Sequence, residues 1–259
     1  MLPVDSLGMD VRPSDINLAR PLARVGFIIG VALLAGVVVD GVLRESQDWL
    51  SGLRWGGAYA AVGIVLLWTT SALVGVVFLR GRLRGEIARG NLAAGLVAGG
   101  NFVAAGWILE SCFFGRDLRS LAVSACFFLV GVATLVVLQF LYRGLTRYAD
   151  DQEVMGENVA SALSYVGVTL ALAIVVAHAA SGPFLGWRAS LRGFAVALLL
   201  ALALYPVRQL VVARLLLGLP ARLRGGALDR MIAQERSVAV GAIEALAYVG
   251  TALLATALG

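Results

Sequence analysis

Long apolar runs alternate with short polar segments rich in arginine along the whole chain. About 20 apolar residues in a helix cross the hydrocarbon core of a bilayer, and a helix pairs nearly all of its backbone polar groups internally. The pattern therefore predicts an all-α, polytopic bundle of about seven transmembrane helices. Their expected ranges are Val25–Leu43, Gly57–Leu79, Leu92–Phe114, Leu121–Tyr142, Val159–Ala180, Phe194–Leu217 and Val238–Leu258.

The composition agrees with a membrane protein. Of the 259 residues, 60% are hydrophobic and only 14% are charged, and the mean hydropathy is +0.89. Soluble domains carry about 25% charged residues, and a water-soluble chain of this length could not bury so much apolar surface. The composition thus excludes a soluble enzyme, a disordered protein and a nucleic-acid-binding domain.

The distribution of arginine predicts the orientation in the membrane. All 21 basic residues are arginine; 15 lie before the first span or in the loops on that side, and six lie on the other side. Because basic loops stay in the cytoplasm, the N-terminus is predicted to lie inside and the C-terminus outside. The net charge of +5 then reflects topology and not a nucleic-acid partner. Residues 1–24 have no apolar core and are expected to form a cytoplasmic tail, not a cleaved signal peptide.

A short motif opens the third and fifth predicted spans. Asn91 and Asn158 each begin the pattern Asn-x-Ala-[Ala/Ser]-[Gly/Ala]-Leu-x-x-x-Gly, and a weaker copy begins with Ser237 at the last span. Each copy follows a charged cytoplasmic loop, which predicts parallel helix-hairpin repeats after one leading helix. The motif residues are Asn91, Ala93, Gly95, Gly100, Asn158, Ala160, Gly167, Ala239 and Gly241. The expected division is a tail (1–24), a leading helix (25–43) and three repeat units (57–114, 121–180 and 193–259).

At the motifs that begin with Asn91 and Asn158, the sequence resembles the YjfL-like family of bacterial inner-membrane proteins, the domain of unknown function 350 (DUF350). That family is built from the same two-helix unit, with Asn-x-Ala-Ala-[Ser/Gly/Ala] at the start of the second helix. The resemblance covers residues 57–259. It implies an integral protein of the bacterial inner membrane with no established activity. The degenerate third copy and the odd number of units depart from the family pattern.

Two physical roles are open for the asparagine motif. In the first, Asn91 and Asn158 cap helices at their cytoplasmic ends, where the side-chain oxygen accepts a bond from an unpaired backbone N–H, worth about 1 kcal/mol. The small residues that follow would then allow neighbouring helices to pack closely. In the second, the asparagines are polar gates of a cytoplasmic vestibule.

Glu244 lies well within the last predicted span. It lies seven residues after Ser237, on the order of 10 Å along the helix. A carboxylate at that depth is expected to face the bundle interior, a wet cavity or a partner, and to serve either in a pathway or in a structural pair. Arg208 follows Pro206, which is expected to kink the sixth span. Arg208 either pairs with Glu244 or extends to the inner interface.

A second set of ionisable residues, Asp40, Glu110 and His178, lies near the outer ends of three outward-running spans. These residues predict either a pH-sensitive outer mouth that attracts cations or side chains that reach the interface or pair locally. Asn101 and Gln139 are expected to form hydrogen bonds between helices.

The sequence contains no catalytic or metal-binding motif, so we expect no enzyme activity, no metal and no cofactor. Cys112 and Cys126 fall within apolar runs and lack metal-ligand spacing. They are expected to be two independent thiols, with a disulfide as the alternative.

Two functions remain open. The first is an oligomeric, channel-like pathway for ions or small solutes with Glu244 in the conducting bundle; GxxxG pairs at residues 26–30 and 95–99 favour the homo-oligomer that it needs. The second is a non-conducting scaffold or partner subunit that recruits a cytoplasmic protein through basic loops, of which the amphipathic segment Pro220–Glu235 is the clearest. Both place the chain in the lipid bilayer of the bacterial inner membrane, without nucleic acid.

Overall fold

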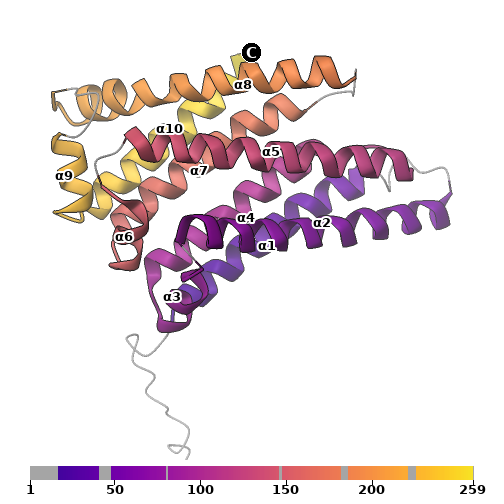
Figure 1. The fold of residues 1–259 in the computed structure, drawn as a ribbon, viewed down its shortest axis with the longest axis horizontal. Helices are drawn as coiled ribbons and strands as arrows, with labels where there is room; N and C mark the ends of the chain where they lie inside the picture. Colours follow the sequence, from indigo (N-terminus) through magenta and orange to yellow (C-terminus); the bar gives the residue numbers. More distant parts are fainter. Residues whose placement is uncertain are drawn as a thin grey trace, which may run out of the picture.

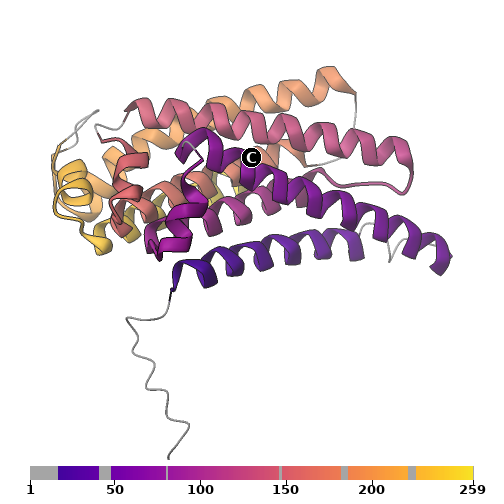
Figure 2. The same ribbon diagram turned by 60° about the horizontal axis from the view of Figure 1, so that its bottom comes forward.

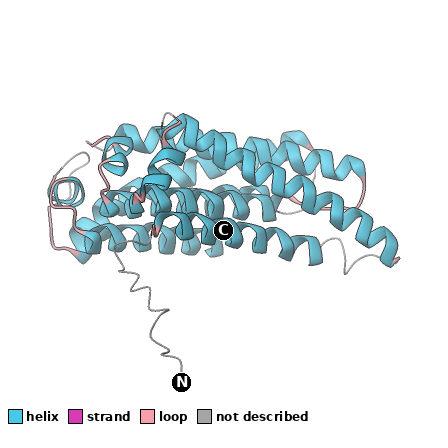
Figure 3. Cartoon of the chain, turned by 90° about the horizontal axis from the view of Figure 1, so that it is seen from below, coloured by secondary structure: helices cyan, strands magenta, loops and turns pink. Residues whose placement is uncertain are grey.

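The structure is a computed structural model that describes residues 17–40, 48–79, 81–145, 148–181, 186–220 and 226–258. Within these ranges all regular secondary structure is helical, and Figure 3 shows only helices and loops there. Seven of the described helices are long and apolar enough to cross a membrane. The predicted all-α, polytopic fold is therefore confirmed.

Along the chain, each short helix follows a pair of long helices (Figure 1). The seven long helices are α1 (Ala19–Val38), α2 (Trp49–Leu79), α4 (Leu92–Cys112), α5 (Leu118–Leu145), α7 (Val159–Ala180), α8 (Trp187–Val207) and α10 (Val238–Leu258). The short helices are α3 (Leu83–Arg89), α6 (Asp150–Met155) and α9 (Ala227–Ala233), and the π-helix η4 (Arg208–Leu216) continues α8. Figure 1 shows α3, α6 and α9 at the same end of the bundle, which we call the short-helix end.

Three helices begin six or more residues earlier than hydrophobicity predicts. α1 starts at Ala19 and not at Val25, because a proline such as Pro21 is tolerated in the first turn of a helix. α2 starts at Trp49 directly after Asp48, whose carboxylate accepts bonds from the N–H groups of Leu50 and Ser51 at 3.3 and 3.1 Å. α8 starts at Trp187. At these ends the helix includes polar and charged residues that are not part of the apolar run.

The short helices are not predicted from the sequence, because six or seven residues are too few to show a clear hydrophobic period. Each short helix is anchored by buried apolar residues: Leu83 in α3, Val154 in α6, and Leu228 and Ile232 in α9. In the sixth span, where Pro206 is predicted to cause a kink, the structure changes from α-helix to π-helix directly after Val207.

Four helices, α1, α4, α7 and α10, form a row that runs through the whole molecule. The most extensive contacts between elements join α1 to α4, α4 to α7 and α7 to α10. In Figure 1, α2, α5 and α8 lie alongside one another in a second layer that α4, α7 and α10 cross obliquely, and in Figure 2 α1 lies along one edge of the bundle. We call α1, α4, α7 and α10 the central helices. All four begin at the short-helix end, so they are parallel, as the repeat pattern predicts.

The central helices touch backbone to backbone. A Cβ added to Gly95 of α4 would lie 2.5 Å from the carbonyl oxygen of Ala19, and one added to Gly241 of α10 would lie 2.4 Å from that of Ala160. A Cβ on Gly26 would lie 2.3 Å from the Cα of Gly99. Only glycine permits such approaches, which membrane helices use in place of a hydrophobic driving force. Both GxxxG pairs are therefore used within the chain, and they offer no free face for the oligomer that the sequence analysis inferred from them.

The substitution Gly167→Ala is expected to destabilise the bundle, because the new Cβ would lie 2.3 Å from the Cα of Ala245. Overpacking typically costs about 1–3 kcal/mol. Alanine gains only about 1 kcal/mol over glycine in helix propensity, so the net effect is a loss of stability. The control is Gly250→Ala, where nothing lies within 4 Å of the new Cβ. It should keep or raise the free energy of unfolding. Denaturant titration in detergent compares the two, and equal stabilities would contradict the close contact.

A charged cap starts α5 outside the membrane span. The backbone N–H of Ser120 donates to Oδ1 of Asp117 and its hydroxyl donates to Oδ2, both at 2.9 Å. These bonds hold the pKa of Asp117 below its ordinary value. Since the folded-state pKa is the lower one, the cap stabilises the protein above the ordinary aspartate range, and this contribution is lost as the pH falls through the folded-state value.

Substitution of Asp117 by asparagine, which is also a good helix cap, isolates the effect of the charge. At neutral pH the variant is expected to melt below the wild type, and the difference should close as the pH is lowered through the carboxylate range. Thermal melting of both proteins from pH 7 to about pH 3 measures it. A melting difference that does not change with pH would show that the charge of Asp117 contributes nothing.

Candidate functional site at the asparagine clamps

Asn91 and Asn158 cap central helices, as the sequence predicts. The Oδ1 atom of Asn91 accepts a bond from the N–H of Ala94 at 3.1 Å, and that of Asn158 accepts one from Ser161 at 3.2 Å. Both side chains are buried, with 1% and 0% of their surface exposed. The capping role is therefore confirmed.

The amide nitrogens of the same residues connect neighbouring units. Nδ2 of Asn91 donates to the carbonyl oxygen of Val154 in α6 at 2.8 Å and to the carboxylate of Glu86 in α3 at 2.9 Å. Nδ2 of Asn158 likewise donates to the carbonyl of Ile232 in α9 at 2.9 Å and to Glu153 in α6 at 2.8 Å. Each asparagine thus binds the short helix before it and the short helix of the next unit. We call this arrangement the asparagine clamp.

A further clamp, which the sequence analysis missed, lies at Asn17 before α1. Its Oδ1 accepts from the N–H groups of Ala19 and Arg20 at 3.1 and 3.3 Å, and its Nδ2 donates to the carbonyl of Ile87 in α3 at 2.9 Å. The signal was present, because Asn17, Ala19, Leu22 and Gly26 have the motif spacing. Two arginines and a proline lie between these motif residues, so the copy was not recognised in the sequence. The leading helix is therefore a copy of the second helix of the repeat.

Ser237 takes the place of the asparagine before α10. Within the described chain no short helix follows α9, so an amide at this position would have no next helix to bind. The neighbouring motif alanine shows the same difference: Ala19, Ala93 and Ala160 are fully buried, whereas Ala239 is exposed. The weak third copy of the motif thus corresponds to the end of the described row.

Glu244 is buried within the bundle, with 1% of its surface exposed. On the same helix, Gly241 and Ala245 contact α7. One turn after Glu244, the ring of Tyr248 packs edge-on against Tyr142 of α5, with centroids 6.2 Å apart. The carboxylate therefore lies on the side of α10 that faces the other helices, as its depth predicts.

The comparisons with known proteins bear on the same helices. The family model described as Domain of Unknown Function (DUF350) matches residues 14–113 and 117–258. The chain belongs to this family. A curated relative, the UPF0719 transmembrane protein of Aquifex aeolicus (strain VF5), is 26% identical over 178 residues, which are 66% of this chain and 61% of the relative. The chain thus spans less than two thirds of that protein. No solved structure matches.

The DUF350 match begins before Asn17 and so includes the clamp on α1, which the resemblance over residues 57–259 left out. It divides the chain into one segment that contains α1–α4 and a second that contains α5–α10. Each segment contains two central helices. The protein is a multi-pass transmembrane member of DUF350.

Polar side chains within this DUF350 bundle differ from the sequence expectations at one position. Nε2 of Gln139 in α5 donates to Oγ1 of Thr169 in α7 at 2.8 Å, which confirms a bond between helices. The prediction for Asn101 is wrong, since its Nδ2 has no hydrogen-bond partner among the described residues. The preceding residue, Gly100, packs on the apolar side chain of Val166, and the side-chain N–H of Gln139 donates to Thr169 instead.

The second set of ionisable residues, Asp40, Glu110 and His178, lies at the ends of neighbouring central helices, away from the short-helix end. Glu110 is partly buried in the last turn of α4, whereas His178, in the last turn of α7, and Asp40, just after α1, are exposed. An outer mouth formed by these residues stays a prediction.

Two further expectations concern Arg208 and the cysteines. Arg208 begins η4, but its side chain lies outside the described residues, so its pairing with Glu244 stays a prediction. Cys112 and Cys126 are free thiols, the first buried and the second exposed. Among the residues that the structure describes, no cluster of three or more histidine, cysteine or acidic side chains could hold a metal.

The substitution Asn158→Asp tests the clamp in this DUF350 protein. Aspartate keeps the oxygen that caps α7 but removes both donors, which leaves the carbonyl of Ile232 unpaired and sets a second carboxylate beside Glu153. We expect a loss of about 1–3 kcal/mol in unfolding free energy, measured by denaturant titration in detergent. Ser237→Asn, which supplies an amide where no next helix is described, is the control and should be neutral. A fully stable Asn158→Asp variant would show that the clamp does not hold the units together.

Proposed function

We propose that this multi-pass membrane protein forms a homo-oligomeric pathway for ions or small solutes across the bacterial inner membrane. The observation that carries the proposal is the burial of Glu244 inside a bundle of membrane-spanning helices. An ionisable side chain within a membrane is costly, and those that natural proteins retain there commonly mark ion pathways or proton relays. A carboxylate at this position can bind and release a cation or a proton.

Polar side chains on α10 and on the neighbouring helices α5 and α7 support the proposal. Tyr248 lies one turn farther along α10 and contacts Tyr142 of α5. Gln139, one turn before Tyr142 on α5, binds Thr169 of α7. These groups come from three helices, α5, α7 and α10, and they give a transferred ion polar neighbours at more than one depth.

The ends of the row support association with further copies. Within the row, the membrane-spanning segments of α4 and α7 are each 72% buried. Those at its ends, α1 and α10, are only 22% and 28% buried, and they are as exposed as α8 and α2 in the second layer. On α10, Ala239 and Leu246 are exposed. A second copy of the chain that covers such faces would enlarge the bundle around Glu244.

The alternative, a scaffold that docks a cytoplasmic protein through Pro220–Glu235, has less support. The apolar side of α9 packs inward, with Leu228 and Ile232 only 5% and 0% exposed, and Arg230 pairs with Glu235 at 3.2 Å. The apolar face that docking would need is thus occupied by the chain itself. Arg222, Leu223 and Arg224 lie outside the described residues.

Flux through proteoliposomes tests the pathway. Wild-type protein is expected to conduct protons or small cations above the level of empty vesicles, and Glu244→Gln should reduce the flux about tenfold or more, because the neutral amide cannot exchange a charge. Glu235→Gln makes the same chemical change at an exposed position and should conduct like the wild type. Equal flux in the wild type and Glu244→Gln, or no flux above empty vesicles in either, would contradict the proposal.

A further inference from the structure

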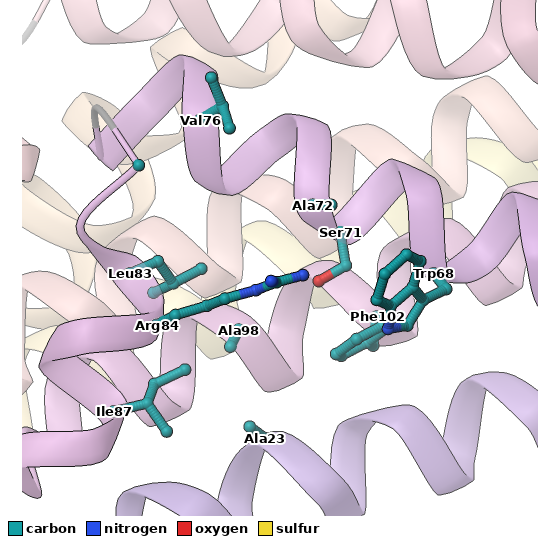
Figure 4. Close-up of a pocket in the computed structure, with 11 residues that line it drawn as sticks. Ala23, Trp68, Ser71, Ala72, Val76, Leu83, Arg84, Ile87, Ala98 and Phe102 are labelled. Atoms are coloured by element: carbon teal, nitrogen blue, oxygen red, sulfur yellow. The ribbon is translucent and has the colours of Figure 1, made fainter.

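A cavity of about 370 Å³ lies between α1, α2, α3 and α4 near the short-helix end. This volume falls in the range of about 300–1,000 Å³ that is usual for small-molecule sites. Its walls are mostly apolar, with Trp68 and Ala72 from α2, Ile87 from α3 and Phe102 from α4 (Figure 4). Among the described residues that line it, Ser71 adds a hydroxyl group and Arg84 a positive charge.

Arg84 points its charge into this cavity. In Figure 4 its side chain extends from α3 toward Ser71 and the ring of Trp68, and the guanidinium carbon lies 5.5 Å from the centre of that ring. The nearest carboxylate along the chain, Glu86, is bound by Arg89 and by the clamp residue Asn91. In the described part of the chain the charge of Arg84 therefore has an aromatic neighbour but no anionic one.

The charge is particular to the first unit. Arg84 stands seven residues before Asn91, and Asp151 stands at the same distance before Asn158. Counted from the carbonyl groups that the asparagine clamps bind, Arg84 stands three residues before Ile87, Asp151 three before Val154, and Asp229 of α9 three before Ile232. The comparable positions of the other two units are thus acidic, and they would repel the anion that Arg84 attracts.

We propose that this cavity binds an anionic phospholipid, with its phosphate at Arg84 and Ser71 and an acyl chain along Trp68, Ala72 and Phe102. Guanidinium groups form strong, charge-assisted bonds with phosphate. Basic pockets between membrane helices on the cytoplasmic side are known to hold lipid headgroups, and the arginine count places the short-helix end on that side. The apolar walls favour a lipid over free phosphate. The proposal does not depend on a transport function.

Native mass spectrometry of the detergent-purified protein tests this site with phosphatidylglycerol, phosphatidylcholine and inorganic phosphate as probes. The wild type is expected to bind phosphatidylglycerol more tightly than phosphatidylcholine, and Arg84→Gln should weaken phosphatidylglycerol about tenfold. Arg82→Gln is the matched control: it removes the same charge two residues away, from a side chain that contacts Met155 and does not line the cavity. It should bind like the wild type.

Arg84→Lys, which keeps a positive charge, should retain most of the binding and separates the loss of charge from a failure to fold. Three results would overturn the proposal. Arg82→Gln and Arg84→Gln could weaken phosphatidylglycerol equally, which would indicate general surface electrostatics. Phosphatidylcholine could bind as tightly as phosphatidylglycerol. Inorganic phosphate could compete at concentrations equal to those of the lipid, which would assign the site to a free anion.

Discussion

Backbone contact between parallel helices is the constraint on which the structure depends. Lipid is as apolar as a leucine side chain, so helices in a bilayer gain little from burying apolar surface and associate through close packing and hydrogen bonds. Gly95 on Ala19 and Gly241 on Ala160 repeat one contact along the row of central helices. The clamps at Asn17, Asn91 and Asn158 supply the hydrogen bonds at one end of that row. Small residues set the spacing, and the asparagines connect each unit to the next.

This arrangement accounts for where polar chemistry is found. At the clamps, each asparagine amide binds a carbonyl group and, at Asn91 and Asn158, a carboxylate as well, so these side chains are structural joints. Glu244 is different, because it lies within a membrane-spanning helix and not at its end. The corresponding motif positions of the other central helices are Arg24, Ala98 and Tyr165, so α10 is the one of the four that has an acidic residue there. The pathway proposal rests on that contrast.

Much of the fold was predictable, because membrane helices are long apolar runs and the seven runs are clear in the sequence. The capping by Asn91 and Asn158 was also predictable, since asparagine before a run of small residues is a local signal. The bonds from their amides to Val154 and Ile232 were not, because they join residues more than 60 positions apart. The copy at Asn17 was hidden by the charged residues and the proline within it. The cavity at Arg84 depends on four helices meeting, which no local pattern reveals.

A structure determined experimentally in a lipid nanodisc tests the central claim most directly. We expect α1, α4, α7 and α10 to pack side by side, with the amides of Asn17, Asn91 and Asn158 at about 3 Å from carbonyl oxygens of α3, α6 and α9. Central helices separated by lipid or by another helix, or asparagine amides turned toward water, would contradict the account.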